Sequence, residues 1–148
     1  LFRTAAETGA ILSGAQEEHI QNLTEYGRNL GMAFQIVDDI LDFEGTEDQL
    51  GKPVGADLLQ GTVTLPAILL MERYPDDNPI PALFRGEDTE ASSKRAVEMI
   101  QNSSIIADSN KFAAEFCDKA VLSLSSLAET RERRSLEELA SYILDRRH

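Results

Sequence analysis

Residues 16–43 read QEEHIQNLTEYGRNLGMAFQIVDDILDF, and this stretch decides the fold. Apolar and small residues recur in it alternately three and four positions apart, which is the spacing of a helix face packed in a bundle. This stripe consists of Ile20, Leu23, Gly27, Leu30, Phe34, Val37 and Leu41. Nearly all of the chain follows helical spacing, and no stretch alternates apolar and polar residues as a half-buried strand does. The sequence therefore predicts an all-α fold, a helical bundle.

Shorter helices are predicted on both sides of this long one. We expect them at about residues 1–13, 65–74, 89–101, 109–128 and from 135 onward, with a short apolar turn at 82–84. Thr64 is the expected cap of the helix that begins Leu65-Pro66, and Ser135-Leu-Glu-Glu138 is a capping-box pattern. In the segment 109–128, Phe112 and Phe116 are expected in the core.

Residues 44–61 read EGTEDQLGKPVGADLLQG and contain four glycines and a proline. Such a stretch is too broken for a regular element, so it predicts a long loop. Loops of this length inside compact domains tend to be functional or mobile.

Composition limits the classes of function. The chain has 148 residues, of which 42% are hydrophobic, and a formal net charge of −12. This charge argues against a nucleic-acid partner, because phosphate backbones are bound by fields of Lys and Arg. The longest apolar run, residues 65–71, is far shorter than the roughly 20 residues that span a bilayer. We expect a soluble, cytoplasmic protein with no integral membrane segment, in which the single cysteine, Cys117, is a buried small hydrophobic residue.

Three aspartates, Asp38, Asp39 and Asp42, interrupt the apolar run FQIVDDILDF at residues 34–43. At about 100° per residue they share with Gln35 an arc roughly 100° wide. Aspartate is about 0.6 kcal/mol worse than alanine inside a helix, and like charges one turn apart repel. Helix propensity therefore does not explain the cluster. Earlier in the helix the same arc passes Gly27 and Gly31, which suggests that something needs room there.

The arc has two interpretations. It is either a solvated polar face or a site for a hard divalent cation such as Mg²⁺. That ion prefers oxygen ligands, is often held by one or two carboxylates, and commonly completes its coordination shell with water and substrate phosphates. An anionic ligand of so acidic a chain would also need a cation between them.

A longer pattern surrounds the aspartates. GMAFQIVDDILDF is followed by LGKPVGADLLQGTVTLP, so that Gly51-Lys52-Pro53, Asp57 and Thr64-Leu65-Pro66 follow the DDxxD spacing in order. This set resembles the second aspartate-rich region of the trans-isoprenyl (polyprenyl) diphosphate synthases. GAILSGA at residues 9–15 and EYGRNLG at residues 25–31 fit as well, and the resemblance weakens beyond about Asp76.

The resemblance implies an isoprenoid-synthase-type helical bundle, usually a homodimer. It also implies a reaction in which an allylic diphosphate is ionised with Mg²⁺, isopentenyl diphosphate adds head-to-tail and a proton is lost. Carried over residue by residue, Asp38, Asp39 and Asp42 would bind Mg²⁺, and Lys52 would contact the allylic diphosphate. Gln35 would assist beside the diphosphate, Phe34 would line the cavity, and Asp57 would orient the loop that carries Lys52.

Two departures from the family pattern limit this carry-over. Thr62 stands where many members have a lysine, so the resemblance does not carry over the diphosphate contact of that lysine. The first aspartate-rich motif is also absent, and helical patterning begins at Leu1 without a cap. We therefore expect residues 1–148 to be the C-terminal portion of a synthase domain that does not catalyse prenyl transfer alone. The alternatives are a short regulatory subunit of a heteromeric synthase and a helical scaffold with a solvated acidic face.

Overall fold

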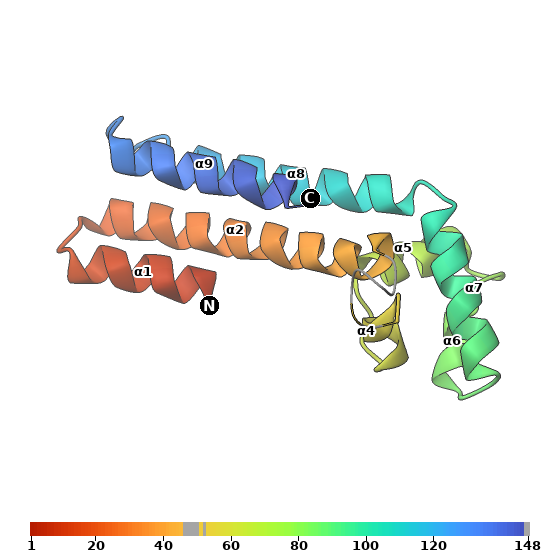
Figure 1. Cartoon of the computed structure of the whole chain (residues 1–148). Coiled ribbons are helices and arrows are strands. Elements are labelled where there is room, and N and C mark those ends of the chain that lie inside the picture. The colour runs from red at the N-terminus through yellow and green to blue at the C-terminus, as the bar shows by residue number, and fades with distance from the viewer. Residues whose placement is uncertain (46–50, 52, 147–148) are drawn as a thin grey trace. The chain divides into compact units, whose positions relative to one another are not determined.

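The computed structural model describes residues 1–45, 51 and 53–146. Every regular element within these residues is a helix, which confirms the all-α prediction (Figure 1). The helices are α1 (Phe2–Leu12), α2 (Glu17–Glu44), α4 (Ala56–Leu59), α5 (Leu65–Arg73), α6 (Ile80–Phe84), α7 (Thr89–Gln101), α8 (Ile105–Ser123) and α9 (Arg131–Asp145). No helix among the described residues is long and apolar enough to cross a membrane.

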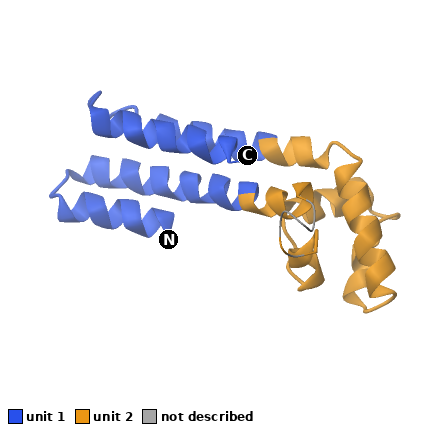
Figure 2. Cartoon of the chain, viewed as in Figure 1, with its two compact units in different colours: residues 1–37, 111–148 blue, residues 38–110 orange. Residues whose placement is uncertain are grey.

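The chain divides into two compact units (Figure 2). The first consists of residues 1–37 and 111–148, and the second of residues 38–110. Helices α2 and α8 each run from one unit into the other.

Small residues let the helices of the first unit approach closely. A Cβ atom added at Gly27 of α2 would lie 2.7 Å from the backbone oxygen of Phe2 and 2.9 Å from the Cβ of Ala6, both on α1. One added at Gly31 would lie 3.2 Å from the Cβ of Phe2. The room that these glycines leave is therefore taken up by α1, which is the element that needs it.

Two hydrogen bonds tie α9 to its neighbours in the first unit. The hydroxyl of Tyr26 on α2 donates to the carbonyl of Leu136 over 2.9 Å. The thiol of Cys117 on α8 donates to the carbonyl of Ala140 over 3.3 Å. Cys117 is only 4% exposed, which confirms its prediction as a buried small residue.

The second unit has its own apolar core. It is formed by the end of α2, by α4 to α7 and by the start of α8, with the buried residues Phe43, Leu58, Ala67, Leu70, Ile80, Leu83, Ala96, Ile100 and Ile105. Gln101 at the end of α7 donates its side-chain amide to the carbonyl of Phe43 over 2.7 Å. The last turns of α2, which carry the aspartates, are thereby fixed on the core of this unit.

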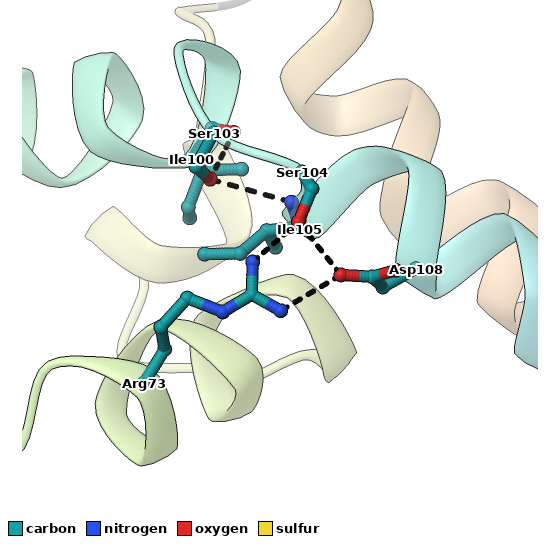
Figure 3. A network of polar contacts seen from close by, with 6 residues as sticks. All are labelled: Arg73, Ile100, Ser103, Ser104, Ile105 and Asp108. Atoms are coloured by element: carbon teal, nitrogen blue, oxygen red, sulfur yellow. Dashed lines mark hydrogen bonds and ion pairs between the residues drawn. The ribbon is translucent and has the colours of Figure 1, made fainter.

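A polar network holds the turn between α7 and α8 against α5 (Figure 3). Arg73 donates to the hydroxyl of Ser104 and to a carboxylate oxygen of Asp108, each over 2.7 Å. Ser103 accepts the backbone N–H of Ile105 over 3.3 Å. These contacts explain why α8 begins at Ile105, four residues before the predicted start.

Three further expectations about the helices are wrong. Residues 56–59, placed in the predicted loop, form the short helix α4. Helix α9 begins at Arg131 rather than Ser135, because Thr130 accepts the backbone N–H of Arg133 and caps it. Phe112, expected in the core, is 41% exposed. Thr64 lies at the N-cap position of α5 with an extended backbone, but among the described residues its side chain makes no capping hydrogen bond.

Candidate active site

The predicted site residues fall in both units. Asp38, Asp39 and Asp42 lie on the last two turns of α2, in the second unit. Asp57 lies on α4 of the same unit. Phe34 and Gln35 precede them on the same helix but belong to the first unit. Lys52 lies outside the residues that the structure describes.

The three aspartates have different surroundings. The side chain of Asp38 is exposed to solvent. Asp39 is 9% exposed and Asp42 only 2% exposed. The arc is therefore not a uniformly solvated face. Of the three aspartates, Asp38 is the most accessible to a ligand.

Asp42 connects the end of α2 to the segment that starts α4. Its carboxylate oxygen Oδ2 accepts the backbone N–H of Asp57 over 3.1 Å. Its backbone carbonyl accepts the N–H of Gly55 over 2.9 Å. The carbonyl of Asp57 in turn accepts the N–H of Thr62 over 2.9 Å. A hydrogen bond thus brings together two of the predicted site residues, Asp42 and Asp57, and the contact is with the backbone of Asp57.

Gly55 allows this connection. Its φ of +74° lies in the left-handed region, which favours glycine. A Cβ atom there would lie 2.8 Å from Cγ2 of Val97 on α7 and 3.5 Å from the ring of Phe43. Gly55 is thus required by backbone conformation and by packing. The sequence analysis did not single it out, although a glycine directly before Ala56-Asp57-Leu58 is a recognisable sign of a helix start.

Phe34 and Gln35 line a hollow of about 410 Å³ in the first unit, together with Phe2 and Arg28. Phe34 is half-buried, and its ring centroid lies 5.1 Å from that of Phe2. The guanidinium of Arg146 lies 4.5 Å from the same centroid, a cation–π contact. The sequence analysis missed this contact, because nothing in the sequence links residues so far apart.

The oxygen donors fit a hard cation in type. Among the described residues, no three acidic, histidine or cysteine side chains are gathered closely enough to hold a metal ion by themselves. Mg²⁺ does not require such a cage, since it is commonly held by one or two carboxylates and by substrate phosphates. The exposed carboxylate of Asp38 is a donor of that kind.

The comparisons with known proteins define the class to which this all-α chain belongs. The family model described as polyprenyl synthetase matches residues 1–100, which include the aspartates and the segment up to the start of α5. The chain belongs to the polyprenyl synthetase family. This confirms the resemblance seen in the sequence.

Individual relatives agree with the family. The chain is 40% identical to a prenyl transferase from Synechocystis over 100% of its own length and 45% of that protein. It is 39% identical to heptaprenyl diphosphate synthase component 2 from Bacillus subtilis, over 97% of the chain and 41% of that protein. The chain thus spans less than half the length of these curated relatives.

Solved structures show the same fold. A polyprenyl synthase from Caulobacter crescentus, complexed with calcium and isoprenyl diphosphate, matches 99% of the chain and 46% of its own with a TM-score of 0.85 at 35% identity. A heptaprenyl diphosphate synthase from Staphylococcus aureus matches 99% of the chain and 46% of its own with a TM-score of 0.87 at 32% identity. The isoprenoid-synthase-type fold predicted from the sequence is confirmed.

Proposed function

We propose that the protein to which this chain belongs is a trans-polyprenyl diphosphate synthase. It condenses an allylic diphosphate head-to-tail with isopentenyl diphosphate and releases diphosphate and a proton. The observation that carries this proposal is the polyprenyl synthetase match, because it spans the acidic end of α2 and the connection that Asp42 anchors.

Asp38 and Asp39 are the residues that we assign to metal binding. Asp38 presents its carboxylate to solvent, and Asp39 follows it on the same turn. When bound, Mg²⁺ would supply positive charge that neutralises the allylic diphosphate as it departs. A metal role is supported by the Caulobacter crescentus polyprenyl synthase, whose structure contains calcium and isoprenyl diphosphate. The choice of Mg²⁺ rests on the preference of that ion for carboxylate and phosphate oxygens.

The other predicted residues keep their proposed roles. Lys52 would hold the allylic diphosphate as a point charge, and Gln35 would donate a hydrogen bond beside it. Asp57 would orient the loop that carries Lys52, since its N–H is fixed on Asp42. Phe34 would contribute to an apolar wall that keeps water from the carbocation.

Incorporation of labelled isopentenyl diphosphate tests the activity. The full-length protein, incubated with Mg²⁺, an allylic diphosphate and labelled isopentenyl diphosphate, is expected to form longer allylic diphosphates. Failure to elongate any allylic diphosphate, in a protein shown to be folded, would reject the proposal.

We also propose that residues 1–148 do not elongate a chain without the remainder of the synthase. The relatives are more than twice as long as the matched region, and this chain contributes one group of metal-binding carboxylates. The same assay on the isolated chain is expected to give no product. Robust elongation by it would show that this part of the account is wrong.

The oligomeric partner is a separate question. A homodimer is our proposal from the family resemblance. Two relatives are named heptaprenyl diphosphate synthase component 2, so a partner of different sequence is the specific alternative. Light scattering on the purified protein separates the two, because a homodimer forms from this protein alone, whereas a heteromer needs a second component.

Cytoplasmic location stays a prediction. Several relatives are named as chloroplastic or mitochondrial proteins. Fluorescence imaging of the tagged full-length protein would decide between these locations.

A scaffold with no catalytic role would show no Mg²⁺-dependent binding of diphosphate in calorimetry.

A further inference from the structure

We propose that Asp42 is a positioning residue, which fixes Gly55–Asp57 on the last turn of α2, rather than a metal ligand. This inference rests on the proposed function for its catalytic consequence, but its structural part can be tested independently. It distinguishes Asp42 from the exposed Asp38, although both belong to one DDxxD pattern.

Asp42 contacts the segment before α4 through both its backbone and its side chain. The backbone carbonyl accepts the N–H of Gly55 over 2.9 Å, and Oδ2 accepts the N–H of Asp57 over 3.1 Å. Two bonds to positions two residues apart fix both the place and the direction of the connecting segment. An ionised acceptor makes the side-chain bond stronger than a neutral one would be.

The burial of its side chain also separates Asp42 from Asp38. Asp42 is 2% exposed, whereas the side chain of Asp38 is open to solvent. Bonds to a carboxylate strengthen where water is excluded. A hydrated Mg²⁺ ion, which keeps several of its waters, fits an exposed carboxylate better than one enclosed by protein.

Packing and backbone conformation also constrain the anchored segment, Gly55–Asp57. Gly55 has a left-handed backbone and lies against Val97 and Phe43, where a Cβ atom would lie 2.8 Å from the valine. Asp57 also accepts the N–H of Thr62. Both Gly55 and Asp57, which follow Lys52 in the sequence, are therefore held by hydrogen bonds. Asp42 supplies the hydrogen bonds from α2 to each of them.

The test uses Asp42→Asn, Asp42→Ala and, as a matched control, Asp38→Asn in the full-length protein. Asparagine retains a side-chain oxygen that can accept the N–H of Asp57 but has no charge for a metal. Two quantities are measured for each variant. The first is the hydrogen-exchange rate of the Asp57 amide, and the second is the Mg²⁺-dependent affinity for inorganic diphosphate by calorimetry.

For Asp42→Ala we expect the Asp57 amide to exchange about tenfold faster or more, because its acceptor is lost. The affinity for diphosphate should fall as well. Asp42→Asn should restore both quantities to within about threefold of the wild type, a tolerance that allows for the weaker neutral acceptor. Asp38→Asn should lose affinity while the exchange of the Asp57 amide stays unchanged.

Two results would overturn the proposal. One is a loss of affinity in Asp42→Asn as large as that in Asp38→Asn, with the Asp57 amide still protected, because Asp42 would then act through its charge on the metal. The other is unchanged exchange of the Asp57 amide in Asp42→Ala. If the wild-type protein bound no diphosphate with Mg²⁺, the proposed function would fail, and the exchange rates would still decide whether Asp42 holds the segment.

Discussion

The three aspartates of α2 show how much the surroundings of a residue matter within one turn of a helix. Asp38 faces solvent, Asp39 is 9% exposed, and Asp42 is buried against the start of α4. The same type of side chain is therefore open to a ligand at one position and holds a backbone N–H at another. Helical geometry gives the direction of a side chain, but the segment that covers it comes from elsewhere in the chain.

Replacing Asp38 should affect catalysis more than substrate binding. In the full-length protein, Asp38→Ala is expected to lower kcat by about 100-fold or more, because the lost interaction strengthens as charge develops on the departing diphosphate. Steady-state kinetics with an allylic diphosphate measures kcat and KM separately. A change confined to KM would count against this role.

Cys117 predicts a dependence of stability on pH. Burial, with a smaller contribution from the charge of Asp118, raises the pKa of the Cys117 thiol to about 11, compared with about 8.5 in an unfolded chain. Between these values the native state binds more protons than the unfolded state, so the unfolding free energy falls as pH rises above about 8.5. Below that pH this contribution is constant.

Urea unfolding between about pH 8 and pH 10 measures the effect. Burial also raises the pKa of Tyr26 to about 12, but this residue contributes only near the upper end of the range, because an unfolded tyrosine ionises near pH 10. Stability should fall more steeply with pH in the wild type than in Cys117→Ala, which lacks the thiol. Parallel pH profiles for the two proteins would contradict the assignment.

At the scale of helices, the contact between α1 and α2 depends on Gly27. Gly27→Ala is expected to destabilise the protein by about 2 kcal/mol, since the new Cβ atom would meet the backbone oxygen of Phe2 at 2.7 Å. Gly9 on α1 is the matched control, because a Cβ atom there meets nothing within 4 Å. Gly9→Ala should stabilise by about 0.5 to 1 kcal/mol through helix propensity.

Chemical denaturation of both variants measures these free energies. Similar changes in the two proteins would indicate that helix propensity, rather than close packing of α1 on α2, decides the effect. A neutral Gly27→Ala variant would show that α1 can move away from α2 at no cost.

The periodicity of the sequence predicts the long helices well and their ends less well. The apolar stripe of α2, from Ile20 to Leu41, extends over about six turns, so its pattern is unambiguous. The start of α9 depends on which of two polar residues caps it. Thr130 is favoured because the extra turn lets Arg133 donate to the carbonyl of Leu127 over 2.7 Å and pair with Glu137 over 2.8 Å. Such contacts are set by tertiary structure and are not visible in a local pattern.

For the candidate site, the sequence predicts which residues are candidates but not their surroundings. The aspartates and the GKPVGAD segment are adjacent enough in sequence for their order to indicate the family. The burial of Asp42 and the contact of Arg146 with Phe34 could not be predicted, because each depends on how distant parts of the chain fold back. Residue type predicts a carboxylate site, and the fold determines which of its carboxylates is accessible to solvent.

For the whole molecule, the net negative charge determines how a diphosphate can bind. A chain with a formal charge of −12 repels a diphosphate, and the carboxylates at the end of α2 repel it most at short range. The proposed reaction thus requires a divalent cation between protein and substrate. Binding without metal would be incompatible with this arrangement of charges.

Calorimetric titration of an allylic diphosphate into the full-length protein, with Mg²⁺ and after its chelation, tests this claim most directly. We predict binding only when Mg²⁺ is present, and an affinity lower by about tenfold or more in Asp38→Asn. Equal affinity with and without the metal, or an Asp38→Asn variant that binds as tightly as the wild type, would contradict the account.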